Sequence, residues 1–356
     1  MTARPVRPFI FTCFPFPLAF SALALAGAAS LALAAPAVPG AEPLHAQESR
    51  VLVVEGLAGT PDMEERFQRW ATRLVDASVD RFGLVADNVI YLAPDPEVDP
   101  SRITGESRAE NVESTIQEIR GSLDEDDRLL IVLIGHGTFD GEESRFALPG
   151  PDLTASDFDR LLEGFPDGSV ALVNTASASG AFLPVLSEPG RVVITATSSG
   201  RERNATEFGG FFTEALAAEG ADTDQDGTVS ILEAFVYARA EVERHYDEQN
   251  LMLTEHALLD DSGDGEGSDE PSRDGEDGSL ASAFVLEPSP TSLAEGDPEL
   301  RALYEERLAL EEEVRDLNAV SDQLDADEYE SSLESLLLEL AELNQRIRQI
   351  EEGANP

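Results

Sequence analysis

The chain has 356 residues, of which 71 are acidic and 24 are basic, and its formal net charge is −47. Every basic residue is an arginine. This balance argues against nucleic acid as a partner, because phosphate binding needs basic patches, and it disfavours docking on anionic membrane surfaces. Strong acidity without lysine is typical of salt-adapted proteins, although a GC-rich genome also exchanges lysine for arginine. Hydrophobic residues make up 42% of the chain, which is enough for a core.

Residues 1–47 have the form of a secretory signal peptide. Arg4 and Arg7 precede an apolar run rich in alanine and leucine, and cleavage would suit the Ala-Pro-Ala motif at 35–37 or a later site after Ala46. The alternative is an uncleaved membrane anchor, because the apolar run approaches the length that spans a bilayer. With either reading, the rest of the chain is expected outside the cytoplasm, in the periplasm or secreted.

Cysteine usage restricts the chemistry of the exported part. The only cysteine is Cys13, which lies inside the export segment. After cleavage, the chain would have no disulfide, no thiolate metal ligand and no cysteine nucleophile.

The segment 48–259 alternates strand-like and helix-like patterns. Short apolar runs predict strands at 50–57, 88–93, 128–137, 169–175 and 191–197. Apolar residues at helical spacing predict helices at 62–82, 112–123, 154–164, 205–219 and 230–246. This alternation predicts an α/β fold in which helices cover both faces of a mostly parallel sheet, a three-layer sandwich.

Polar residues that suit catalysis follow two of these strands. IVLIGHGTFDG (131–141) places His136 between two glycines just beyond a strand, and ALVNTASASGAF (171–182) places Ser177, Ser179 and Gly180 beyond the next one. In an open parallel sheet, ligands bind outside the carboxyl ends of the strands. We therefore expect both groups at the same edge of the sheet.

The segments IGHGT, TASASG and RVVITATSSG, in this order, resemble the caspase and legumain group of cysteine peptidases, which includes metacaspases and bacterial caspase-like proteins. The resemblance covers about 50–259 and implies a caspase-like fold and peptide-bond hydrolysis. It implies that His136 is the catalytic histidine and that the N–H of Gly137 is an oxyanion-hole donor. The family's catalytic cysteine falls on Ser177, and the acidic residue that usually begins this motif is replaced by Thr175.

Serine at position 177 changes what the site can do. A cysteine attacks as a thiolate, whereas a serine hydroxyl is far less acidic and needs a base within hydrogen-bonding distance. That base in turn needs a third group that orients it. No residue is marked by its position as this third group; Asp140 is merely near in sequence. These demands favour a protein without peptidase activity over a working Ser177–His136 hydrolase.

Residues 222–233 match the loop of an EF-hand, which binds calcium. Oxygen ligands are expected at loop positions 1, 3, 5, 7, 9 and 12, with a glycine at position 6. Gly227 supplies the turn, while Ala234 stands after the loop where a larger apolar residue is usual. The predicted ligands are Asp222, Asp224, Asp226, Thr228 through its carbonyl, Ser230 and Glu233. The alternative is an Asp-rich turn whose Ser230 caps the following helix.

The remaining chain divides into a linker and a helical tail. Residues 260–295 are acidic and rich in glycine and serine, which predicts a solvated linker, with SAFVLEP as a candidate edge strand. In 296–356, two series of apolar residues spaced by three and four are out of phase, which favours a helical hairpin or broken coiled coil. Such a pair would either pack on the main domain or self-associate through 296–352.

Three functional hypotheses result. The first is an exported, non-catalytic peptidase homologue that binds a protein or peptide partner, or acts as a scaffold, with one calcium ion. The second is an active hydrolase of the endopeptidase type that uses a Ser177–His136 dyad. The third is a calcium-responsive assembly module in which the tail makes the contacts.

Overall fold

The computed structural model describes residues 47–287, 326–354 and, between them, positions 300, 302–304, 306, 307, 309, 310, 314 and 317. The predicted signal peptide or anchor therefore lies outside the described residues, apart from its last position. Among the described residues, no helix is both long and apolar enough to cross a membrane.

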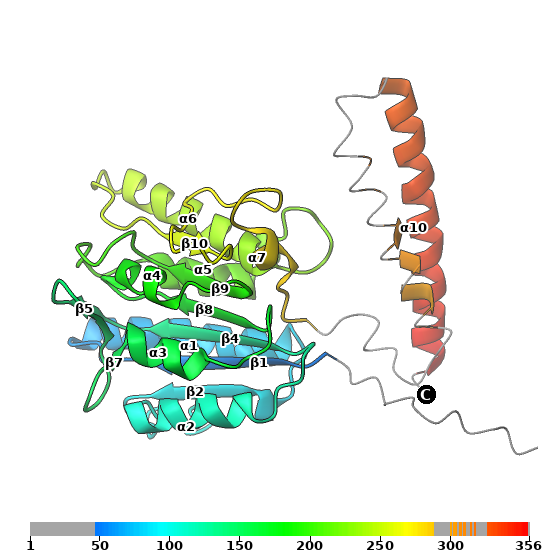
Figure 1. Ribbon diagram of the computed structural model, residues 1–356. Helices are drawn as coiled ribbons and strands as arrows, with labels where there is room; N and C mark the ends of the chain where they lie inside the picture. Colours follow the sequence, from blue (N-terminus) through cyan, green and yellow to red (C-terminus); the bar gives the residue numbers. More distant parts are fainter. Residues whose placement is uncertain are drawn as a thin grey trace, which may run out of the picture. The chain divides into compact units, whose positions relative to one another are not determined.

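A seven-stranded sheet forms the centre of the main domain (Figure 1). Its strands, in spatial order, are β10 (Leu258–Asp260), β9 (Arg191–Thr195), β8 (Val170–Asn174), β4 (Arg128–Ile134), β1 (Ser49–Glu55), β2 (Val89–Ala93) and β3 (Gly105–Glu106). All neighbouring strands are parallel except β10, which is antiparallel to β9. The prediction of an α/β fold with a mostly parallel sheet is confirmed.

Helices cover both faces of this sheet. One face is covered by α1 (Pro61–Asp80), α5 (Phe208–Ala217) and α6 (Ile231–Glu248), and the other by α2 (Ala109–Arg120), α3 (Ala155–Leu162) and α4 (Leu183–Leu186). Short 3-10 turns lie at Ala86–Asn88, Ser179–Ala181 and Glu219–Ala221. This arrangement is compatible with a three-layer sandwich.

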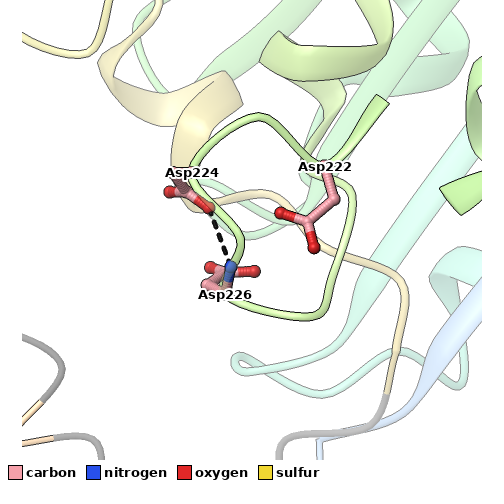
Figure 2. Close-up of side chains that lie close together, drawn as sticks. All are labelled: Asp222, Asp224 and Asp226. Carbon is pink, nitrogen blue, oxygen red and sulfur yellow. Dashed lines mark hydrogen bonds between the residues drawn. The ribbon is translucent and has the colours of Figure 1, made fainter. Parts of the chain in front are cut away.

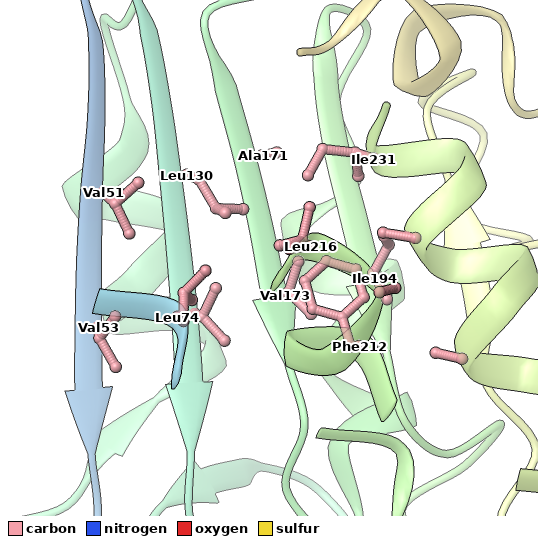
Figure 3. Close-up of a cluster of buried hydrophobic side chains, with 14 of the residues drawn as sticks. Val51, Val53, Leu74, Leu130, Ala171, Val173, Ile194, Phe212, Leu216 and Ile231 are labelled. Atoms are coloured by element: carbon pink, nitrogen blue, oxygen red, sulfur yellow. The ribbon is translucent and has the colours of Figure 1, made fainter. Parts of the chain in front are cut away.

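The core lies between the sheet and these two helical layers. In β4, every residue from Leu129 to Ile134 is fully buried, because a central strand with helices on both sides has no face open to water. Figure 3 shows part of one layer, where Val51 and Val53 of β1 lie on the same face as Leu130 of β4, and Phe212 of α5 packs nearby. Burial of this size is the main force that holds the strand ends in place.

A small antiparallel sheet follows the end of β4. It consists of β5 (Gly137–Phe139), β6 (Ser144–Phe146) and β7 (Leu153–Thr154). Gly137 pairs with Phe146, and this pairing holds the chain next to His136 in an extended conformation.

The segment 260–295 was predicted to be a solvated linker, and this prediction is wrong for residues 260–286. β10 begins just before it and adds to the sheet, and α7 (Ser279–Ala283) overlaps the first two residues of the candidate edge strand, whose described remainder at 284–287 forms no strand. Phe284 and Leu286 are each 1% exposed. An acidic, glycine-rich composition is therefore not enough to predict a linker here.

Buried aspartates explain why this loop is ordered. Asp260 accepts hydrogen bonds from the N–H groups of Gly263 and Gly265, at 2.9 and 3.1 Å. Asp261 accepts from Gly278 and Ala281, both at 2.8 Å. These carboxylates replace water as partners of the backbone, so the loop can pack against apolar side chains.

The C-terminal part contains a 29-residue helix, α10 (Ala326–Ala354). Leu303 and Tyr304 form a buried cluster with Leu343 and Ile347 of this helix. Glu306 and Arg346 form an ion pair at 3.9 Å. The predicted hairpin or coiled coil over 296–356 falls partly outside the described residues and stays a prediction.

Candidate functional site

The two predicted catalytic segments lie at the same edge of the sheet. β4 and β8 are parallel neighbours, with Leu133 paired to Asn174, and both strands end there. His136 follows β4 and Ser177 follows β8, so the topology brings them to adjacent loops, as the sequence predicted.

Ser177 is held by the backbone of Gly137. Its Oγ accepts a hydrogen bond from the Gly137 N–H at 3.3 Å and lies 3.3 Å from the Gly137 carbonyl, to which it can donate. The residue is only 4% exposed. A Cβ on Gly137 would lie 2.4 Å from the carbonyl oxygen of Ser177, so only glycine allows the two loops to approach this closely.

His136 is oriented by a different part of the chain. Its Nε2 lies 3.0 Å from the carbonyl oxygen of Ala58, in the loop that follows β1, and its ring packs edge-on against Phe67 of α1. A carbonyl oxygen can only accept, so Nε2 carries the proton in this contact, and the neutral ring has its lone pair on Nδ1.

The group that orients His136 is thus a backbone carbonyl. Asp140 does not fill this role: its carboxylate binds Arg145 at 2.7 Å and the N–H groups of Glu142 and Glu143. The backbone hydrogen bond from Glu143 and the ion pair with Arg145 hold the pKa of Asp140 well below its usual range. Sequence reasoning missed Ala58 because any residue type carries a carbonyl.

The loop after Ser177 is tightly clamped. Ala178 is completely buried and has φ +57°, a left-handed conformation that is strained for any residue other than glycine. The Gly180 N–H donates to Thr197 Oγ1 at 2.8 Å, and Thr197 donates its own N–H to Ser179 Oγ at 3.2 Å. Ser179 and Gly180, which the sequence predicted at this site, therefore hold the loop in place. Among the described residues, neither forms a hydrogen bond with His136.

The predicted calcium loop brings three of its ligand residues together (Figure 2). Carboxylate oxygens of Asp222, Asp224 and Asp226 all lie within 4.8 Å of one another. Gly227 has φ +93°, and its N–H donates to Asp222 at 3.0 Å, which folds the loop back on its first residue. Asp222 Oδ1 is buried and has no hydrogen-bond partner.

The other three predicted ligands hold the end of the loop. Glu233 accepts from the Thr223 N–H at 2.8 Å with Oε1, and from Ser230 with Oε2 at 2.9 and 2.8 Å. Ser230 in turn caps α6 by accepting from the Glu233 N–H at 3.2 Å. Thr228 donates both its N–H and its hydroxyl to Asp226. The helix cap that the sequence offered as an alternative is therefore present beside the acidic group.

Charge in this loop affects its titration. Burial, together with the charges of Asp226 and Glu233, raises the pKa of Asp224 above its usual range. Burial also acts to raise the pKa of Glu233, but hydrogen bonds from Ser230 and Thr223 outweigh it and lower the pKa. A cation between these carboxylates would relieve the repulsion on Asp224.

No protein-family model matches this chain, and no curated protein matches it. The assignment of a function accordingly depends on the residues and on their geometry.

Proposed function

We propose that this chain is an exported homologue of the caspase and legumain peptidases that does not hydrolyse peptides and acts in binding or scaffolding, with a calcium ion in the loop 222–233. The motifs around His136 and Ser177, and their position at the carboxyl edge of a mostly parallel sheet, support the family resemblance.

One observation carries the non-catalytic proposal: the environment of the Ser177 hydroxyl. The hydroxyl is buried and interacts with the N–H and the carbonyl of Gly137, and no hydrogen bond joins it to His136 in the described chain. A serine is a useful nucleophile only when a base takes its proton. A cysteine at this position would not depend on such a contact to the same degree, because a thiol ionises more easily.

A second candidate function, a serine hydrolase, is favoured by the contact between His136 and Ala58. In the neutral ring, this contact takes up the proton on Nε2, which makes Nδ1 the nitrogen that can act as a base. The Ser177 hydroxyl would then have to reach Nδ1 of His136 in the substrate complex, because catalytic hydrogen bonds often form only on substrate binding.

Labelling distinguishes the two functions. We expect no covalent labelling of Ser177 by a fluorophosphonate probe and no turnover of peptide substrates by the native protein. Rapid labelling at Ser177, lost in Ser177→Ala, would overturn the proposal and establish the hydrolase.

A cysteine variant tests whether the family's machinery is otherwise intact. Because residues 48–356 contain no cysteine, iodoacetamide would report on position 177 alone in Ser177→Cys. We expect alkylation whose rate falls in the double variant Ser177→Cys/His136→Ala, since His136 would lower the thiol pKa. An equal rate in the two proteins would show that His136 does not activate this position.

The calcium proposal is supported by the three grouped carboxylates and by the buried Asp222 oxygen that lacks a partner. Calcium prefers six to eight oxygen ligands, which Asp222, Asp224, Asp226, Ser230, the Thr228 carbonyl and Glu233 would supply. Glu233 would have to exchange its hydrogen bonds with Thr223 for the ion. A single hand of this kind would bind weakly, in the range of extracellular modules.

Titration calorimetry of the native protein with calcium at physiological salt should show one weak site. Glu233→Gln should abolish it, whereas Glu248→Gln, at the far end of α6, should leave it unchanged. Binding should weaken as the pH falls toward the raised pKa of Asp224, because protons then compete with the ion. The absence of both a calcium heat and a calcium-dependent rise in melting temperature would contradict the site.

A further inference from the structure

A cavity separate from the Ser177 site lies at the carboxyl ends of β1 and β2. Its volume is about 310 Å³, within the range of small-ligand pockets. Glu55, the last residue of β1, and Tyr91 of β2 line it together with the loop 56–60. One feature of the sequence indicates this cavity: Glu55 is a single glutamate at the end of the apolar run RVLVVEGL.

Glu55 is a buried carboxylate with one oxygen available. The residue is 4% exposed, and the hydroxyl of Tyr91, itself fully buried, donates a hydrogen bond to Oε2. Among the described residues, no hydrogen bond reaches Oε1, and Glu55 lines the cavity. Oε1 is therefore open to the cavity with no donor from the described protein, which favours a ligand that brings one.

The charged side chains that line the cavity are all acidic: besides Glu55, they are Glu64 in the first turn of α1 and Asp95 after β2. Asp99, which is paired with Arg102, lies close enough to raise the pKa of Tyr91. Within the described chain, no arginine lines the cavity. The imidazole of His136 contacts the carbonyl of Ala58, a residue of the cavity wall. An anionic ligand would be repelled here, and a cationic one would be attracted.

The remaining lining suits an organic cation better than a metal ion. Pro61, Val98 and Ile103 provide an apolar wall on which an alkyl chain can pack. A metal ion needs several ligand atoms around it, and among the described residues only the group Asp222, Asp224 and Asp226 has that arrangement. We propose that this cavity binds a small organic cation, with a primary ammonium or guanidinium group on the free oxygen of Glu55 and its alkyl part against the apolar wall.

Binding should depend on the ionisation of Glu55. Burial raises the pKa of Glu55 to about 7, the hydrogen bond from Tyr91 opposes this, and Glu64 adds to it. The ionised form is the one that pairs with a cation, so affinity should rise with pH through this range. Between pH 5.5 and 8 the ionised fraction, and with it the apparent affinity, should rise by about thirty-fold.

Ligand-observed NMR with n-butylammonium tests the proposal on the full chain. The probe stays charged at every pH used, and sodium chloride at about 0.3 M screens weak association with surface carboxylates. 1-Pentanol serves as the neutral probe of similar size. We expect binding of the cation that strengthens from pH 5.5 to 8 and at least a tenfold weaker effect with the alcohol.

Matched variants locate the site. Glu55→Gln should abolish the binding of n-butylammonium, and Glu64→Gln should weaken it, while Glu65→Gln, whose side chain is 78% exposed on the same helix, should not change it. Circular dichroism checks that each variant is folded. Because Glu64 is exposed, Glu64→Gln should fold and still tests the site if Glu55→Gln does not fold. Equal binding by all three variants, a flat pH profile, or equal binding of the alcohol would each overturn the proposal.

Discussion

Gly180 lies where the loop after Ser177 crosses the loop after β9. A Cβ on Gly180 would lie 2.2 Å from the backbone nitrogen of Ser199 and 2.4 Å from the carbonyl carbon of Ser198. These are main-chain atoms, which cannot move away as the end of a flexible side chain can. Gly180→Ala should therefore lower the free energy of unfolding by roughly 2–4 kcal/mol, in the range of severe overpacking.

Gly121→Ala is the matched control for this measurement. Gly121 follows α2 with φ −70°, and its added Cβ would meet only ordinary contacts at 3.5 Å. Chemical denaturation should place this variant within about 0.5 kcal/mol of the native protein. An equally small change in the free energy of unfolding of Gly180→Ala would contradict the close approach of the two loops.

Glu55 should also give the protein a pH-dependent stability. Its pKa is raised from the usual 4.5 to about 7 in the folded state, chiefly by burial. The protonated form is thus favoured on folding, and its contribution is present below the unfolded pKa and lost as the pH rises through 7. Between pH 5 and 8, the native protein should lose roughly 2–3 kcal/mol of stability relative to Glu55→Gln.

Denaturant titrations of both proteins at pH 5 and pH 8 measure this difference. Glu255, whose pKa burial also raises to about 7, is present in both proteins, so its effect cancels. A constant difference between native protein and Glu55→Gln at the two pH values would contradict the raised pKa.

At the level of single residues, the sequence predicted which side chains lie at the same edge of the sheet but not which groups they bind. His136 and Ser177 could be placed at one sheet edge because both follow strands that read as buried and parallel. His136 contacts the carbonyl of Ala58, and Ser177 contacts the backbone of Gly137. Both partners are main-chain groups, which every residue has. No residue pattern marks such partners, so the orientation of a site is harder to predict than its location.

The elements of the main domain were largely predictable, because each has one dominant pattern. The helix expected at 62–82 is observed as Pro61–Asp80, and the strand expected at 128–137 as Arg128–Ile134, with His136 beyond its end. The prediction failed for residues 260–286, where the composition indicated a linker. There the aspartates bond to nearby backbone groups, and this order depends on tertiary contacts that a local pattern does not contain.

The helical tail gives a prediction at the level of elements. Leu343 of α10 is 3% exposed in its cluster with Leu303, whereas Leu338 of the same helix is 59% exposed. Leu343→Asp should therefore separate the packed segments, because a buried carboxylate without a partner is costly. Leu338→Asp should have little effect.

Limited proteolysis of the full chain reads out this difference. Cleavage C-terminal to residue 287 should accelerate in Leu343→Asp and should match the native rate in Leu338→Asp. Equal rates in the two variants would show that the contact between Leu303 and Leu343 does not stabilise the tail.

For the whole molecule, the position of the candidate sites follows from the topology. β1, β4 and β8 are adjacent and parallel, so their carboxyl ends share one edge, where Glu55, His136 and Ser177 all lie. The EF-hand-like loop instead lies between α5 and α6, outside the sheet. We infer that substitutions in the loop 222–233 and at the sheet edge will have nearly additive effects on stability, since distant sites rarely couple.

The net charge of −47 makes a prediction that concerns the chain as a whole. At low ionic strength, the many carboxylates repel one another more strongly in the compact state than in the unfolded one. This repulsion destabilises the folded state. Added salt screens this repulsion over a Debye length that falls from about 10 Å at 0.1 M to about 3 Å at 1 M. The melting temperature should therefore rise by several degrees between about 0.05 and 0.5 M sodium chloride and level off above that, because screening is then nearly complete.

Scanning calorimetry in the presence of a calcium chelator measures this effect without any contribution from calcium binding to the loop 222–233. Potassium chloride should raise the melting temperature by the same amount. A melting temperature that fell over the same range would mean that ion pairs such as Arg102–Asp76, at 2.7 Å, stabilise the fold more than the net repulsion opposes it.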